Sequence, residues 1–126
     1  MRRTASASIM VIGADSHFSY LMRRYVRTSA HQIVFANPGE DALTLVQQAK
    51  PVAIVLGANV PPVLCRHLLF ALKANQATRQ IPVILCSWQE EDPADRIEGA
   101  DLHLRMPILY EDFEAALAQV GVLVDA

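Results

Sequence analysis

Short apolar runs that alternate with amphipathic segments limit most strongly the folds open to this chain. The runs are continuous and rich in β-branched residues, which is typical of strands buried on both faces. We expect five strands, at residues 8–12, 32–36, 52–56, 83–86 and 102–104. Strands that alternate with helices predict a parallel sheet joined by right-handed crossovers. The predicted fold class is therefore α/β, a (βα)5 doubly wound five-stranded parallel sheet.

The segments between these runs carry apolar residues at helical spacing. Five helices are expected, from residue 16, from residues 37–40, after residues 61–62, within residues 93–99 and over residues 110–120. Ser16 and Asn37 are residue types that commonly cap helix N-termini, so we expect them to begin the first two helices. No internal repeat or linker interrupts the pattern, which predicts one domain over residues 1–126.

Composition narrows the possible functions. The 126 residues are 52% hydrophobic with a formal net charge of −2, which gives no support to nucleic-acid binding. No apolar stretch approaches the roughly eighteen residues of a membrane span. Cys65 and Cys86 lie far apart and outside any metal-binding spacing. We expect them to be buried free thiols in a cytoplasmic protein.

In a doubly wound sheet the ligand site lies beyond the carboxyl ends of the strands. Those ends fall at residues 13–15, 57–59, 87–88 and 105–107. The side chains there are mostly inert. The sequence therefore predicts no catalytic residue, no cofactor-binding residue and no metal ligand.

Three segments resemble the receiver domain of bacterial response regulators, within a likeness that runs from about residue 9 to residue 120. Residues 52–61 look like the third strand and the phosphoacceptor loop, with Gly57 at the acceptor position. Residues 81–88 are similar to the fourth strand, which ends in the family's switch Ser/Thr, here Ser87. Residues 99–108 resemble the family's Gly-Ala-Asp run into a Lys-Pro pair. The resemblance implies the same flavodoxin-like fold and a cis peptide before Pro107.

The chain departs from that family at the reactive positions. The resemblance implies two acidic residues that hold a divalent cation, an aspartate that accepts phosphate and a lysine that binds the phosphoryl oxygens. This sequence has Gly13 and Ala14, Gly57 and Met106 in their places. Glycine and alanine offer no oxygen to Mg²⁺, and glycine offers no nucleophile. Phosphoryl chemistry is therefore not expected.

Two polar residues remain near these positions. Asp15 stands one position beyond the expected acidic pair, and a single carboxylate cannot rebuild a cation site. Ser87 is expected to serve as a polar strand end, since no phosphoacceptor stands near it.

We expect Gly57→Asp to leave function unrestored and to lower the free energy of unfolding by no more than about 1 kcal/mol.

The third predicted helix carries apolar residues on two sides. Val63 and Phe70 point away from its inward stripe, and Phe70 faces the space left by a fourth helix that is about one turn shorter than in the family. Trp88, His103 and Tyr110 complete the candidate interface. His103 is expected to be half-buried on an edge strand. A basic face of arginines 23, 24 and 27 is expected to be solvated, with docking of an acidic partner as the alternative.

These features favour a phosphorylation-independent pseudo-receiver, an interaction or dimerisation module in bacterial signal transduction. We expect no enzymatic activity, no cofactor and no Mg²⁺, and a protein partner or a second copy rather than nucleic acid or membrane. One alternative is a phosphate-competent receiver with unusual chemistry. Another is a flavodoxin-like small-ligand or nucleotide binder that uses the cleft at the strand ends, although the chain has no glycine-rich phosphate loop.

Overall fold

The computed structural model describes residues 7–13, 15–28, 31–37, 42–57, 60–87 and 99–122. Strands and helices alternate along most of this length. In chain order the elements are β1 (Ser8–Ile12), α1 (Ser16–Thr28), β2 (Gln32–Ala36), α2 (Ala42–Ala49), β3 (Ala53–Leu56), α3 (Pro62–Ala74), β4 (Val83–Ser87), β5 (Leu102–Arg105) and α4 (Tyr110–Gln119). The strand positions agree closely with the apolar runs of the sequence.

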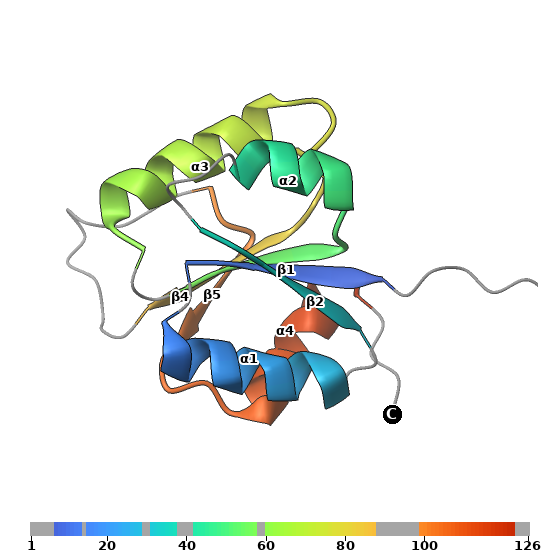
Figure 1. Cartoon of the computed structure of the whole chain (residues 1–126), viewed down its shortest axis with the longest axis vertical. Coiled ribbons are helices and arrows are strands. Elements are labelled where there is room, and N and C mark those ends of the chain that lie inside the picture. The colour runs from blue at the N-terminus through green and yellow to red at the C-terminus, as the bar shows by residue number, and fades with distance from the viewer. Residues whose placement is uncertain are drawn as a thin grey trace, which may run out of the picture.

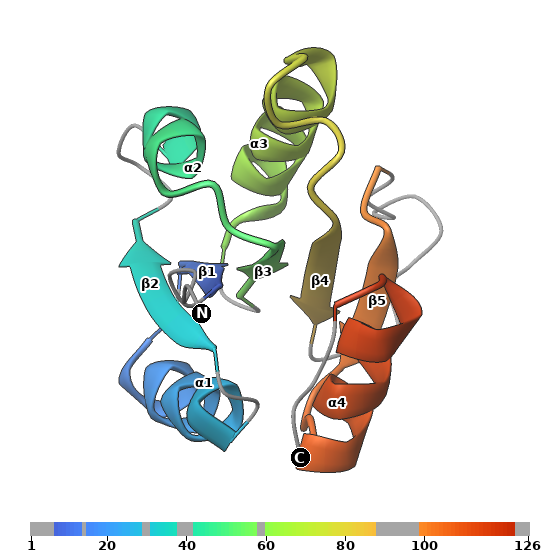
Figure 2. The same ribbon diagram turned by 90° about the vertical axis from the view of Figure 1, so that its right-hand side faces the viewer.

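The five strands form one parallel sheet in the order β2-β1-β3-β4-β5 (Figure 2). Helices α1 and α4 cover one face, and α2 and α3 cover the other (Figure 1). This is the flavodoxin-like strand order, in which the chain reverses direction across the sheet between β1 and β3. The predicted fold class is confirmed.

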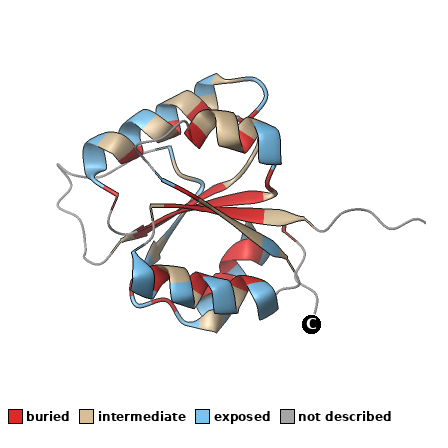
Figure 3. Ribbon diagram, viewed as in Figure 1, coloured by how far each residue is buried: buried red, intermediate tan, exposed pale blue. Residues whose placement is uncertain are grey.

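Strand β1 shows how the apolar runs build two cores at once. Ile9 and Val11 belong to the core beneath α1 and α4, whereas Met10 and Ile12 belong to the core beneath α2 and α3. All four side chains are fully buried. In the ribbon coloured by burial, the buried residues gather in the strands of the sheet and on the helix faces turned toward it (Figure 3). Successive strand residues point to opposite faces, so a continuous apolar run is what a doubly covered strand requires.

The N-terminal cap of α1 differs from the expectation. Asp15, not Ser16, caps the helix, because its Oδ1 accepts the backbone N–H of Phe18 at 2.8 Å. Both residue types suit that position, so composition alone does not choose between them. The expected start of the second helix after Asn37 and the expected fourth helix before Gly99 lie outside the described residues.

Both cysteines are buried free thiols, as expected. Burial raises the pKa of Cys86 to about 12, because the thiolate would lose its hydration there. No helix within the described ranges is both long and apolar enough to cross a lipid bilayer.

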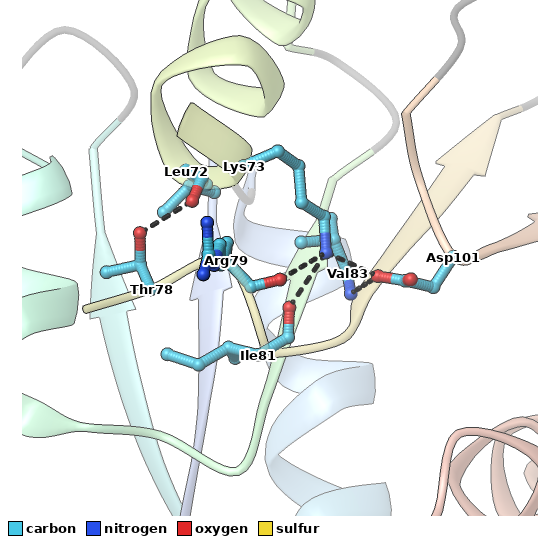
Figure 4. A network of polar contacts seen from close by, with 7 residues as sticks. All are labelled: Leu72, Lys73, Thr78, Arg79, Ile81, Val83 and Asp101. Atoms are coloured by element: carbon cyan, nitrogen blue, oxygen red, sulfur yellow. Dashed lines mark hydrogen bonds and ion pairs between the residues drawn. The ribbon is translucent and has the colours of Figure 1, made fainter. Parts of the chain in front are cut away.

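A polar network joins α3 to the beginnings of β4 and β5 (Figure 4). Lys73 Nζ donates to the carbonyl oxygens of Arg79 and Ile81, at 3.3 and 3.2 Å. It also forms an ion pair of 2.9 Å with Asp101 Oδ2. The same Oδ2 accepts the backbone N–H of Val83 at 2.7 Å. The network fixes the end of the sheet opposite the strand carboxyl ends.

We expect Asp101→Ala to lower the free energy of unfolding by about 1.5–3 kcal/mol, the usual contribution of hydrogen bonds to a charged group. The substitution leaves the N–H of the fully buried Val83 without its acceptor. The ion pair is partly exposed and adds little. Asp101→Asn keeps an acceptor oxygen and should cost less. Urea unfolding followed by circular dichroism measures both, and an equal, negligible loss in the two variants would contradict this assignment.

Candidate functional site

The carboxyl ends of adjacent strands bring two glycines together. Ile12 and Leu56 are paired in the β1–β3 ladder, so Gly13 and Gly57, which follow them, are neighbours. Gly57 N–H donates to the Ile12 carbonyl at 2.9 Å. Gly13 N–H donates to the Ala36 carbonyl at 3.0 Å, which ties the end of β1 to the end of β2. The expected phosphoacceptor position thus lies directly against the end of β1.

The space for a side chain at Gly57 is filled by backbone. A Cβ on Gly57 would lie 2.4 Å from the carbonyl oxygen of Gly13 and 3.3 Å from that of Ile12. Gly13 has a φ of 73°, in the left-handed region that glycine adopts readily. The positive φ of Gly13 thus accompanies a carbonyl that lies against Gly57. That carbonyl fits there because Gly57 has no side chain.

This contact corrects the expected cost of Gly57→Asp. A loss of at most about 1 kcal/mol assumes that the position is open. Backbone atoms cannot swing aside as the end of a flexible side chain can, so any side chain at Gly57 must displace the β1 end. The sequence shows the missing nucleophile but not this contact. Two glycines, each directly after one of two adjacent buried strands, were the available signal.

The remaining acid near the site is used in the fold. Asp15 is exposed, and its carboxylate caps α1 through the N–H of Phe18. The carboxylate is also well placed there for the positive end of the helix dipole. Ala14 lies outside the described residues.

A backbone hydrogen bond joins Ser87, at the expected switch position, to Met106, at the expected lysine position. Ser87 ends β4 half-buried, and its carbonyl accepts the N–H of Met106 at 2.6 Å. The Met106 side chain is only 5% exposed and belongs to the core beneath α1 and α4. The Met106–Pro107 peptide is cis, as expected. Met106 is therefore a core residue, and its thioether has no free access to a ligand.

The residues at these strand ends do not fit a magnesium ion. Mg²⁺ prefers an octahedral set of oxygens with one or two carboxylates. Gly13 and Gly57 have no side-chain oxygen, and Asp15 caps a helix. Within the described ranges, no three His, Cys, Asp or Glu side chains gather closely enough to share a metal ion.

The proposed interface residues fall on different faces of the molecule. Val63 and Phe70 are exposed on α3, at 62% and 77%, as the helical phase predicts. His103 is exposed on β5 rather than half-buried, because β5 is an edge strand; its ladder partner Leu85 places it on the face of the sheet that α2 and α3 cover. Trp88 lies outside the described residues. Of the described members, Val63, Phe70 and His103 therefore lie on the α2 and α3 side of the sheet, and Tyr110 lies on the α1 side.

Tyr110 belongs to the opposite side of the sheet from α3. Its ring is half-buried and meets the edge of the Tyr25 ring, with centroids 5.4 Å apart. Burial, and then the carboxylate of Glu114, raise the pKa of the Tyr110 phenol above its ordinary value. Tyr25 in turn donates its hydroxyl to the Ile108 carbonyl at 2.8 Å. Tyr110 thus helps to pack α4 on α1.

Several solved structures share this fold. The chemotaxis response regulator CheY4 of Vibrio cholerae superposes with a TM-score of 0.77 at 18% identity, covering 92% of this chain and 99% of that one. The signal receiver domain of a histidine kinase from Syntrophus aciditrophicus gives 0.74 at 19% identity, over 91% and 89%. The receiver domain of a Pseudomonas aeruginosa sensor histidine kinase, which has a magnesium ion in its active-site cleft, gives 0.75 at 15%, over 93% and 99%.

No protein-family model and no curated protein matches the sequence. Each superposition nevertheless covers most of this chain and most of the other chain. They show that the chain has the fold of a receiver domain. At these identities the likeness defines the fold, and the function must be argued from the residues at the strand ends.

Proposed function

We propose that the chain is a phosphorylation-independent pseudo-receiver that acts as a protein–protein interaction or dimerisation module in bacterial signal transduction. One observation carries the proposal: the Gly13 carbonyl oxygen lies 2.4 Å from where a Cβ on Gly57 would be. The acceptor position therefore lacks both the nucleophile and the space for one. A fold so similar to receivers, with that position closed, supports a role in binding rather than in phosphoryl transfer.

The other reactive positions support the same proposal. Phosphoryl transfer to a carboxylate needs cations that neutralise the charge developing on the phosphoryl oxygens. The residue at the lysine position is Met106, which is buried in the core. Asp15, the remaining carboxylate after β1, stabilises α1. Restoring any one of these residues leaves the others missing.

The exposed side of α3 is the proposed contact surface. Val63 and Phe70 lie two helical turns apart and share one face, with exposed fractions of 62% and 77%. Large side chains this exposed are common at protein contacts. Helix α3 has no acidic residue, and Arg66 and His67 are exposed between the two apolar side chains. A partner surface that is apolar with an acidic rim fits it best.

A flavodoxin-like role in binding a small ligand is less well supported. Such a ligand uses the crevice at the carboxyl ends of β1 and β3. The close approach of Gly13 to Gly57 narrows that crevice, and Gly13 N–H is already bonded to Ala36. No observation in the described part of the chain favours this alternative.

Amide NMR spectra recorded during titration with Mg²⁺, and then with Mg²⁺ plus beryllofluoride, test the proposal. We expect no saturable shift of the amides of Gly13, Gly57 or Ser87, because these positions supply no carboxylate ligand. Matched additions of NaCl and NaF control for ionic strength, and a phosphorylatable receiver domain serves as positive control. Saturable shifts at millimolar Mg²⁺ would show that the cation site persists.

A further inference from the structure

The outer edge of β2 borders a surface hollow that is far from α3. The hollow has a volume of about 390 Å³ and lies between α1 and the start of β2. Its lining residues are Arg23, Arg27, His31, Gln32 and Ile33. None of the described residues that line it is acidic. The hollow therefore joins a basic helix face to one of the two edges of the sheet.

The backbone of β2 presents unpaired groups to this edge. Gln32 N–H donates to the Ala7 carbonyl, and the Ala36 carbonyl accepts from Gly13, so these residues turn their polar groups toward β1. Strand residues alternate in direction, so the N–H and C=O of Ile33 and Phe35 face outward. Within the described ranges these outward groups have no hydrogen-bond partner. They can accept an added strand.

The two lining arginines stand beside this edge. Arg23 and Arg27 are exposed, and the Arg23 guanidinium lies 4.8 Å from the centre of the Phe35 ring. The ring holds Arg23 above the strand edge. Four residues along a helix span about 6 Å. Alternate side chains of a strand are separated by about 6.6 Å, so two acidic residues at positions i and i+2 of an added strand match the two arginines.

We propose that the outer edge of β2 binds an extended acidic segment of a partner protein as a sixth strand, with alternate carboxylates facing Arg23 and Arg27. The backbone bonds to Ile33 and Phe35 supply affinity, and the arginines select acidic sequences. This surface is distinct from the exposed face of α3. The inference therefore goes beyond the proposed function and does not depend on which partner α3 contacts.

A second copy of the chain fits this edge poorly. Two β2 edges paired about a two-fold axis would form one continuous sheet with both α1 helices on the same side. Arg23 and Arg27 of the two copies would then face each other with like charges, which opposes pairing. Nucleic acid has no strand-like backbone groups to meet Ile33 and Phe35. An acidic peptide meets both features of the site.

The test uses the full chain and two capped heptapeptides, one alternating glutamate with valine and one alternating lysine with valine. Amide NMR should show the N–H groups of Ile33 and Phe35 shifting and becoming slower to exchange with the glutamate peptide only. Arg27→Glu should weaken binding about fivefold to tenfold, because one favourable charge contact becomes unfavourable. Added salt should weaken binding in the parent.

Arg24→Glu is the matched control. Arg24 lies on the same helix but contacts Tyr20 rather than the hollow, so its reversal should leave binding within about twofold of the parent. Absence of saturable shifts, equal weakening by Arg24→Glu, or shifts confined to α3 overturns the proposal. A peptide-free dimer that Arg27→Glu dissociates overturns it in favour of a second copy. None of these outcomes bears on the proposed role of Phe70, which a separate variant tests.

Discussion

Gly57→Ala should lower the free energy of unfolding by about 3 kcal/mol, the upper part of the range for overpacking, although it adds a single methyl group. The new Cβ would lie 2.4 Å from a backbone oxygen, so the end of β1 must move before the residue fits. That movement strains the bond from Gly57 N–H to the Ile12 carbonyl. The melting temperature should fall by about 10 °C, as a domain of this size predicts.

Gly121→Ala is the matched control for that substitution. Gly121 has a φ of 92°, but nothing lies within 4 Å of a Cβ built there. Gly121→Ala should therefore lower the free energy of unfolding only by the strain of a left-handed backbone conformation, about 1 kcal/mol. Thermal and urea unfolding of both variants give the comparison. If Gly57→Ala costs no more than Gly121→Ala, the acceptor position is open and the closed-site account is wrong.

Phe70→Glu should weaken self-association or partner binding by about tenfold to a hundredfold while leaving the fold unchanged. A phenylalanine buried against a partner contributes about 1.5–3 kcal/mol, which corresponds to that change in affinity. The side chain is 77% exposed in the isolated chain, so its replacement removes little internal packing. Sedimentation velocity over a range of concentrations measures self-association, and cross-linking to a bound partner measures the alternative.

Tyr20→Glu provides the control for that variant. Tyr20 is 59% exposed on α1, on the other side of the sheet from α3, and receives the same change from aromatic to acidic. We expect it to retain association. Circular dichroism and the melting temperature should match the parent in both variants. Unfolding of Phe70→Glu would show that Phe70 is a core residue, and unchanged association would place the contact surface elsewhere.

The fold could be predicted from the sequence because the three central strands, β1, β3 and β4, are buried on both faces. Such strands are continuous apolar runs, and the Ile9 to Ile12 run joins two cores in one segment. The phase of α3 was also predictable, since a helix with one apolar stripe inward leaves Phe70 on the far side. These signals are local and repeat along the chain.

The site could be predicted only in its composition. That Gly57 supplies no nucleophile is visible in the sequence, but its contact with Gly13 depends on how β1 and β3 are paired. Asp15 and Ser16 are both residue types that cap helices well, and the hydrogen bond from Phe18 N–H shows that Asp15 is the cap. The open edge of β2 beside Arg23 and Arg27 likewise follows from strand order rather than from local pattern.

Intact-mass spectrometry after incubation with acetyl phosphate and Mg²⁺ tests the central claim most directly. Among the residues that the structure describes, the closed contact between Gly13 and Gly57 and the helix-capping role of Asp15 leave no carboxylate placed to accept a phosphoryl group. The account predicts an unmodified mass under conditions that phosphorylate a control receiver domain. A mass increase of one phosphoryl group, mapped by peptide fragmentation to a side chain at the strand carboxyl ends, would contradict it.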